Sequence, residues 1–336
     1  MNNIKDFIPN QYCKYPNDAT LPEKGFRGLN IKGKIKFQGI LVKHNIMLNQ
    51  FYKKALRSKK AAIGPFWGEF GNFLLHFLPF VMHLHKNGVV LSLCCSEQFA
   101  PFLKDENGNP IFEELLTLPK VHTEHPASGN SLKQIPITYQ KILNKFLVNS
   151  YNNKIPTLDL SDANLYWYSF RNWQLKGKQH FYNLSKYEKK KNKVVLFPRK
   201  KGPSYTANNG EILDYNKICN ILSDYFDEVT IIGQPEMSES SIEVSSKINY
   251  KLGSNEVVLK EVSEAQLIVS QHSGAIHMGA YTNTPSLIIF KGILPIKGLD
   301  DTLRFRENSD ESRIYLVTTF KYFHEFLTDF KSLNYH

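Results

Sequence analysis

The sequence has few cysteines and no long hydrophobic run. These shortages argue against a zinc-binding or disulfide-rich protein and against a protein that spans a membrane. Only four of its 336 residues are cysteines, and their spacing matches neither a zinc motif nor a disulfide framework. The longest apolar stretches, residues 73–84 and 89–95, are shorter than the roughly 18–20 residues that cross a membrane. Residues 1–16 are polar, unlike a secretory signal. These absences predict a soluble protein in a reducing compartment, the cytoplasm, that meets a membrane only at its surface.

Acidic residues are also scarce relative to basic ones. The chain has 42 lysines and arginines against 31 aspartates and glutamates, a formal charge of +11. Such a surface attracts polyanions, anionic membrane surfaces or phosphorylated substrates, although a basic protein with no polyanionic partner fits the same composition. No nucleic-acid-reading motif is present and the basic residues are scattered, so we expect no nucleic-acid partner. At this length and with 42% hydrophobic residues, two domains of ordinary size are expected.

The pattern around residues 267–290 is the most informative in the chain. A short apolar run, 267–270, is followed by a turn at Ser273-Gly274, a small-residue helix over 275–281 and a strand over 287–290. In an open parallel sheet such a turn lies at the carboxyl ends of the strands, where ligands bind. A helix start there also suits a phosphate. A plain βαβ unit without a ligand is the alternative.

The first half of the chain repeats this order of elements. An apolar run at 61–63 leads into a glycine-rich loop over 64–72, a helix over 73–86 that Pro79 kinks, and a strand over 89–95. Glycines at such a loop let a ligand approach the backbone. Two patterns of this kind predict an α/β fold with two Rossmann-like domains. We assign residues 1–190 to the first domain and 191–336 to the second.

The remaining elements are predicted less directly. Residues 1–57 contain a strand-like segment at 34–43 and are not otherwise placed in the fold by their pattern. Residues 98–103 and 111–118 are expected to be helical or irregular, around a turn at 107–110. The charged run at 187–193 is expected to be a solvated linker. The other predicted elements are a helix at 139–151, strands at 194–197, 229–232 and 314–317, and helices at 211–226 and 320–333. The last helix has one apolar face, and it either packs on the second domain or crosses back onto the first.

The segment H-S-G-A-I-H at 272–277 resembles the D-S-G-P-M-H motif of bacterial heptosyltransferases and related GT-B glycosyltransferases. The matching positions are Ser273, Gly274 and His277. The sequence departs from the motif at His272 and Ala275. A similar H-x-G-A turn occurs in the O-linked N-acetylglucosamine and xylose transferases, which are the second choice of family. The resemblance implies a GT-B fold, with two Rossmann-like domains facing a central cleft.

The resemblance also implies a nucleotide-sugar donor bound by the second domain. A loop at 198–206 carries three cations and a glycine directly after the strand at 194–197. Arginine grips phosphate oxygens in a two-pronged way and lysine supplies a point charge, although a basic surface loop is the alternative. In the turn at 233–236, the glutamate either binds the ribose or caps the turn. The predicted donor-binding residues are Arg199, Lys201, Gly233, Glu236, His272, Ser273, Gly274, Ala275 and His277.

The loop G-E-F-G-N at 68–72 resembles the G-G-x-G-D loop that opens the acceptor domain of heptosyltransferases. Its predicted acceptor-loop residues are Gly68, Gly71 and Asn72. The family has its base at the last of these positions, but an amide takes up no proton at neutral pH. Glu69 is the nearest carboxylate, and partial burial would raise its pKa toward that of a base. We therefore predict Glu69 as the base and His76 as a second catalytic candidate. The alternatives are a solvated or lysine-paired glutamate and a structural histidine.

No Asp-x-Asp motif and no His/Cys cluster with metal spacing occurs in the chain. We therefore expect no metal and no cofactor beyond the nucleotide-sugar substrate. The predicted reaction transfers a sugar to a saccharide or lipid-linked saccharide acceptor in the synthesis of cell-surface polysaccharides or other glycans. The basic surface adds an expected association with the inner face of a membrane. Two alternatives remain open: a catalytically inactive GT-B-like module that binds a glycan or nucleotide, which Asn72 would explain, and a nucleic-acid-binding protein.

Overall fold

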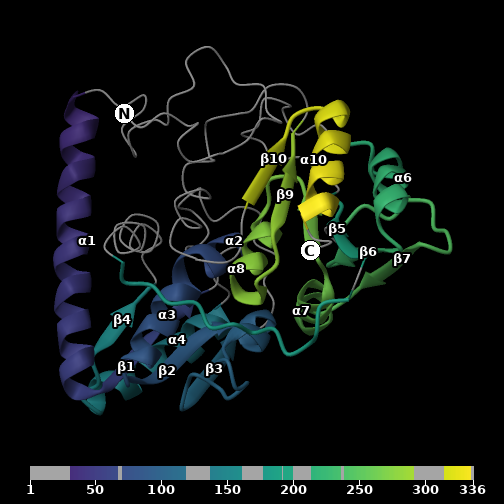
Figure 1. The fold of residues 1–336 in the computed structure, drawn as a ribbon. Coiled ribbons are helices and arrows are strands. Elements are labelled where there is room, and N and C mark those ends of the chain that lie inside the picture. Colours follow the sequence, from purple (N-terminus) through teal and green to yellow (C-terminus); the bar gives the residue numbers. More distant parts are fainter. Residues whose placement is uncertain are drawn as a thin grey trace. The chain divides into compact units, whose positions relative to one another are not determined.

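The computed structural model describes residues 31–66, 70–118, 137–160, 177–190, 192–199, 213–235, 238–290 and 314–333. The chain divides into two compact units with the boundary between Leu184 and Ser185. We call them the N-terminal unit and the C-terminal unit, and each contains one parallel sheet (Figure 1). The predicted α/β class with two Rossmann-like parts is confirmed by these sheets.

The sheet of the N-terminal unit has the strand order β3-β2-β1-β4, and all neighbours are parallel. Its strands are β1 (Lys60–Phe66), β2 (Val90–Ser96), β3 (Glu114–Leu118) and β4 (Thr157–Asp159). Gly64 in β1 has a φ of +149°, and a Cβ atom there would lie 2.5 Å from the carbonyl oxygen of Cys94 in β2. Only glycine therefore allows β1 to lie so close to β2 at this point. The strand at 114–118 corrects the expectation of helical or irregular structure there.

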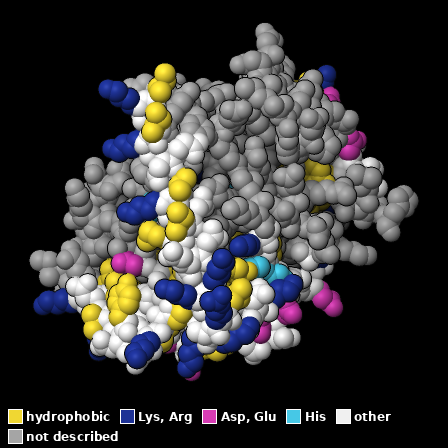
Figure 2. Space-filling model, turned by 90° about the vertical axis from the view of Figure 1, so that its left-hand side faces the viewer, with side chains coloured by type: hydrophobic (Ala, Val, Ile, Leu, Met, Phe, Trp, Pro, Cys, Tyr) yellow, Lys and Arg dark blue, Asp and Glu magenta, His cyan; other side chains and the backbone are white. Residues whose placement is uncertain are grey.

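A long helix, α1 (Ile31–Ser58), precedes this sheet and corrects the strand-like assignment of 34–43. Alternation of lysine with apolar residues over a few positions suggested a strand. The second half of the helix instead buries Leu48, Phe51 and Ala55, which share one helical face. Packing of this face against the sheet therefore decides the conformation. Figure 2 shows the outer side of α1, where hydrophobic and basic side chains are exposed.

The predicted helix over 73–86 is confirmed, and its irregularity has a specific form. It consists of α2 (Phe70–Asn72), a π-helical turn η2 (Phe73–Phe77) and α3 (Leu78–Lys86). The N–H of Leu78 donates to the carbonyl of Phe73, five residues back, and Pro79 has no N–H to donate. The π-turn therefore lies directly before the proline, as expected for a kinked helix. Two further elements of this unit are η3 (Glu97–Phe102) and α4 (Ile137–Asn152), the latter at the predicted helix 139–151.

The sheet of the C-terminal unit has the order β10-β9-β8-β5-β6-β7, again all parallel. Its strands are β5 (Lys193–Phe197), β6 (Glu228–Gly233), β7 (Ile248–Leu252), β8 (Leu267–Ser270), β9 (Ser286–Ile289) and β10 (Ile314–Val317). All of these except β7 coincide with predicted strands. The chain builds β5, β6 and β7 outward in one direction, then returns to the other side of β5 for β8, β9 and β10.

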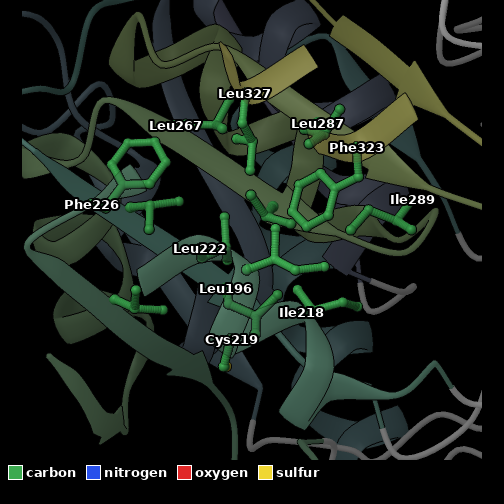
Figure 3. Close-up of a cluster of buried hydrophobic side chains, with 14 of the residues drawn as sticks. Leu196, Ile218, Cys219, Leu222, Phe226, Leu267, Leu287, Ile289, Phe323 and Leu327 are labelled. Atoms are coloured by element: carbon green, nitrogen blue, oxygen red, sulfur yellow. The ribbon is translucent and has the colours of Figure 1, made fainter. Parts of the chain in front are cut away.

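The helices of the C-terminal unit are α6 (Tyr215–Tyr225), α7 (Asn255–Glu264), η6 (Gly274–Met278), α8 (Gly279–Thr282) and α10 (Phe320–Leu333). A hydrophobic cluster joins α6 and α10 to the sheet, with Ile218 and Leu222 meeting Phe323 and Leu327 (Figure 3). The apolar face of α10 thus packs into the core of its own unit. Helix α6 begins later than predicted because Asp214 caps it, accepting a 3.0 Å hydrogen bond from the N–H of Lys217.

A buried ion-pair network lies at the start of β5. The side chain of Lys193 is fully buried, and its Nζ lies 2.6 Å from Glu261, 2.8 Å from Glu264 and 3.3 Å from Glu228. Lys190 also pairs with Glu264, at 2.8 Å. The charged run at 187–193 is therefore not solvated throughout, which corrects the expectation of a solvated linker. Its last lysine is part of the core because three carboxylates on the neighbouring elements surround it.

Candidate functional site

The carboxyl ends of β5 and β8 form the switch point of the C-terminal sheet. These two strands are parallel neighbours, and Phe197 is paired with Ser270. The chain leaves β5 toward β6 and leaves β8 toward β9, on opposite sides. Ligands of open parallel sheets bind at this position. Arg199 and His272 each lie two residues beyond the paired residues, so the structure brings these two predicted donor-binding residues together.

Hydrogen bonds join Arg199 to the turn after β8. Its Nη1 donates to the carbonyl oxygen of His272 at 3.1 Å. Its backbone N–H donates to the hydroxyl of Tyr215 at 2.9 Å, and that hydroxyl donates to the side-chain oxygen of Gln271 at 3.1 Å. Burial raises the pKa of Tyr215 to about 12, against the opposing effect of Arg199, so the phenol keeps its proton. The guanidinium has five N–H donors, and the bond to His272 leaves others for an anion.

The turn after β8 is tied to the end of β5 by a second contact. The hydroxyl of Ser270 donates to the carbonyl oxygen of Phe197 at 3.4 Å and lies 3.1 Å from the hydroxyl of Ser273. Ser273 is extended, and the predicted helix over 275–281 consists of a 3-10 helix at Gly274–Met278 followed by α8. Ser273, Gly274 and Ala275 are half-buried. This 3-10 helix therefore begins two residues after the carbonyl that Arg199 contacts, and its first residues are only half-buried.

His272 and His277 are both buried, with 6% and 4% of their surface exposed. Burial, assisted by the charge of Arg199, lowers the pKa of His272 to about 4. His272 is therefore neutral at pH 7, and the positive charge at this site comes from Arg199. His277 lies inside the 3-10 helix on the side that packs into the unit.

The buried, neutral His272 predicts a pH-dependent loss of stability. The unfolded chain protonates this group near its ordinary pKa of about 6.5, whereas the folded chain resists protonation down to about 4. The contribution is fully present above pH 6.5 and is lost as the pH falls toward 4. Over this pH range, we expect the free energy of unfolding of the wild type to fall by on the order of 3 kcal/mol more than that of His272→Asn. Urea unfolding at a series of pH values measures this difference, and parallel curves for the two proteins would contradict it.

Gly233 supports the same corner of the sheet. It ends β6 with a φ of +142°, and a Cβ atom there would collide with the side chain of Ser238. Ser238 forms an isolated antiparallel β-bridge with Arg199. The N–H of Glu239 donates to the carbonyl oxygen of Pro198 at 2.8 Å. The glycine thus lets residues 238 and 239 lie against the segment that carries Arg199. A direct contact of Gly233 with the donor stays a prediction.

The N-terminal sheet has its own switch point, between β1 and β4. The chain builds β2 and β3 on one side of β1 and β4 on the other. Gly64 is paired with Asp159, and the N–H of Leu160 donates to the carbonyl oxygen of Gly64 at 3.1 Å. The predicted acceptor loop follows β1, so it begins at this switch point. Asp159 is a carboxylate at the same end of the sheet.

The structure describes some of the predicted site residues of the N-terminal unit, and these are partly or fully buried. Gly71 is half-buried and Asn72 is buried, both in α2. His76 lies in the π-turn and is 2% exposed, beside the stacked rings of Phe73 and Phe77. Such burial favours a packing role for His76, and its catalytic role stays a prediction. Four predicted site residues lie outside the described residues, and they are Gly68, Glu69, Lys201 and Glu236.

Sequence analysis did not single out Tyr215, Gln271 or Asp159. The signal for Tyr215 is an aromatic residue with a hydroxyl in the first turn of the helix that follows the basic loop. Gln271 directly precedes the recognised turn. Asp159 ends a strand of three residues, which is too short to give a periodic pattern. Within the described ranges, no group of three or more His, Cys, Asp or Glu side chains is arranged to hold a metal ion.

No protein-family profile and no curated protein matches the sequence. Among solved structures, the chain is similar to the heptosyltransferase WaaC of E. coli with ADP, at 11% identity and a TM-score of 0.49, over 81% of this chain and 99% of that one. It is similar to the ADP-heptose lps heptosyltransferase II of E. coli, at 13% identity and 0.48, over 82% and 99%. A family 9 glycosyl transferase of Veillonella parvula gives 12% and 0.44, over 81% and 89%. At these identities and scores, the activities of those proteins do not carry over by similarity.

Proposed function

We propose that the protein is a glycosyltransferase of the GT-B type that binds a nucleotide-sugar at the C-terminal unit. The observation that carries this proposal is the convergence of Arg199 and the turn at 271–274 on the switch point of the sheet. A guanidinium beside a helix start supplies positive charge and N–H donors to one anionic group. A diphosphate is such a group, and it is the leaving group of a nucleotide-sugar.

The proposed reaction is displacement at the anomeric carbon. A base takes the proton of an acceptor hydroxyl, the new C–O bond forms, and the bond from the sugar to the diphosphate breaks. Arg199 and Lys201 stabilise the charge that develops on the diphosphate, so we propose a reaction without a resident metal. Glu69, in the loop after β1, is the proposed base. Gly68 in that loop, with Gly71 and Asn72 in the short helix that follows it, would shape the acceptor side of the site.

The acceptor that we propose is a saccharide or a lipid-linked saccharide, in the synthesis of a cell-surface polysaccharide or other glycan. The protein would act in the cytoplasm at the inner face of a membrane, where such acceptors are assembled on lipids. The net charge of +11 supports attraction to that surface. The nucleotide of the donor follows from the binding experiment below.

A catalytically inactive module that binds a nucleotide or glycan is the second candidate. It is favoured by Asn72, a buried amide at the position where the resembled family has an acid. The enzyme and a nucleotide-binding module both predict nucleotide binding, but only the enzyme transfers sugar. A thermal-shift panel of UDP, GDP, ADP and CMP tests the shared part, because a ligand that binds only the folded state raises the melting temperature. No shift with any of these nucleotides would contradict the enzyme and the nucleotide-binding module, and would leave a module that binds a glycan.

Arg199→Ala is expected to weaken binding of the nucleotide found in that panel by about 1.5–3 kcal/mol, the range for a hydrogen bond to a charged group. Titration calorimetry measures this loss. Lys247→Ala is the matched control, because Lys247 is an exposed cation of the same unit whose Nζ donates to the carbonyl oxygen of Ser223. Unchanged affinity in a folded Arg199→Ala protein would show that the phosphate assignment is wrong.

A further inference from the structure

Helix α1 presents apolar side chains to solvent along one line. Five of its large hydrophobic residues are between 44% and 76% exposed. They are Ile31, Ile35, Val42, Ile46 and Met47. At 3.6 residues per turn, the first four fall within an arc of roughly 60°. We call these four residues the apolar stripe, and Figure 2 shows hydrophobic side chains at intervals along α1.

The same helix carries only positive charge. Its 28 residues include seven lysines and arginines and no aspartate or glutamate. Lys32, Lys36, Lys43 and Lys54 are exposed and lie together beside the apolar stripe, within roughly 40° of one another. Lysine side chains in this position extend their charged ends away from an apolar face. The helix is therefore basic and amphipathic on its outer side, which is the pattern of a helix that lies on a membrane surface.

Among the described side chains of α1, the buried apolar ones lie in its second half. Its buried residues, Leu48, Phe51 and Ala55, form the face that packs against the sheet. The described side chains of residues 31–43 are all exposed, apart from the half-buried Gly33. The described residues of the apolar stripe and its flanking lysines are thus open to solvent, while the second half of α1 packs on the sheet. No helix in the described part of the chain is long and apolar enough to cross a membrane.

We propose that the outer side of α1, formed by the apolar stripe and its flanking lysines, binds the surface of an anionic lipid bilayer. The lysines would lie at the headgroups and the stripe would enter the boundary with the acyl chains. This inference rests on the membrane location proposed above, and it is independent of the transfer reaction. It adds to that proposal that α1 makes the contact and that the lipid is anionic.

A second copy of the chain fits this surface less well. Pairing two such helices would bring two wholly positive faces together, at an electrostatic cost. The apolar stripe is also interrupted by Gln38 and Gly39 and ends before Asn49 and Lys53, so it does not continue as the heptad seam of a coiled coil. An anionic bilayer complements both the charge and the apolar stripe.

Co-sedimentation of the full chain with vesicles tests the proposal. One set of vesicles contains equimolar phosphatidylglycerol and phosphatidylcholine, and the other contains phosphatidylcholine alone. We expect binding to the anionic vesicles, weakened by added salt, and much weaker binding to the neutral ones. Each lysine near an anionic surface contributes a factor of about five in affinity. The triple variant Lys32→Glu, Lys36→Glu, Lys43→Glu is therefore expected to lose at least about a hundredfold.

A second variant tests the apolar part. Ile35→Ser, Val42→Ser, Ile46→Ser is expected to lose at least about tenfold in affinity for the anionic vesicles. The matched controls change exposed residues of the C-terminal unit, Val244→Ser and Lys321→Glu, which are 64% and 83% exposed, and they should bind as the wild type does. Arg199→Ala should also bind vesicles normally, which separates this proposal from the nucleotide site. Circular dichroism checks that every variant is folded.

Three results would overturn the proposal. The first is equal binding to neutral and anionic vesicles. The second is wild-type binding by both α1 variants. The third is a dimer, detected by sedimentation without lipid, that the serine variant abolishes, since the apolar stripe would then be covered by a second copy.

Discussion

Lys193→Met is expected to lower the free energy of unfolding by about 3–5 kcal/mol, the usual cost of removing one partner of a buried ion pair. Methionine keeps the length and much of the volume of lysine but carries no charge. The substitution would leave Glu261 and Glu264 buried, with exposed fractions of 5% and 8% for their side chains, and without the buried cation that they share. Urea unfolding of the full chain measures the loss.

Lys251→Met is the matched control for this prediction. Its Nζ lies 3.1 Å from the same Glu261, but its side chain is 39% exposed. Pairs that reach solvent contribute about 1 kcal/mol or less, so the control should change stability only slightly. A triple variant that adds Glu261→Gln and Glu264→Gln to Lys193→Met should recover part of the loss, because no uncompensated buried charge remains. Equal effects of Lys193→Met and Lys251→Met would contradict the prediction.

The pH dependence of unfolding gives a second check on the network. Burial by itself raises the pKa of Glu264, but the hydrogen bonds and charges of Lys190 and Lys193 outweigh it and bring the pKa down to about 2. A carboxylate with a lowered pKa stabilises the fold above its unfolded pKa of about 4.5. That contribution is lost as the pH falls from there toward 2. Lys193→Met should therefore lose less stability than the wild type over this range.

Glu69→Gln is expected to reduce turnover at least about a hundredfold while leaving nucleotide affinity nearly unchanged. General-base catalysis typically raises the reaction rate by a factor of about 100 to 10,000. The glutamine amide keeps the shape of the side chain but takes up no proton. Glu69 lies outside the described residues, between Phe66 at the end of β1 and Phe70 at the start of α2. Phe66 is in register with Cys95 of β2, and the ring of Phe70 lies near those of Phe99 and Phe102 in η3. Turnover with the identified donor and calorimetry with its nucleotide measure the two quantities.

Asp159→Asn is the control that tests whether the loss of turnover is specific to Glu69. Asp159 is paired with Gly64 at the carboxyl end of β4, so it is a second carboxylate at the same switch point. If Glu69 is the base, Asp159→Asn should lower turnover much less than Glu69→Gln. Near-normal turnover of Glu69→Gln together with a hundredfold loss in Asp159→Asn would transfer the role to Asp159. Nucleotide binding without transfer by the wild type would identify the inactive module.

Local sequence patterns were sufficient for much of the C-terminal unit. The apolar runs at 194–197, 229–232 and 267–270 identified three central strands, because strands covered on both faces of a parallel sheet are apolar along their length. The turn at Ser273-Gly274 could also be recognised locally, because two small residues lie shortly after a buried strand and before a short helix. These properties depend on neighbours in the sequence.

Other features depended on residues that are distant in the sequence. β4 has three residues and is a strand because β1 pairs with it. Residues 34–43 have a strand-like alternation, but they are helical because the second half of α1 packs on the sheet. Lys193 belongs to a charged run, yet it is buried because carboxylates about 70 residues away surround it.

The same distinction applies to the site. Arg199 and His272 could each be proposed from the strand that precedes it. Their hydrogen bond joins residues 73 positions apart, and it forms because β5 and β8 are neighbours in the sheet. Tyr215 joins the two segments only because α6 begins beside them. A local pattern specifies which element a segment forms, whereas strand order and packing decide which side chains meet, because those contacts are made between segments that carry no information about one another in sequence.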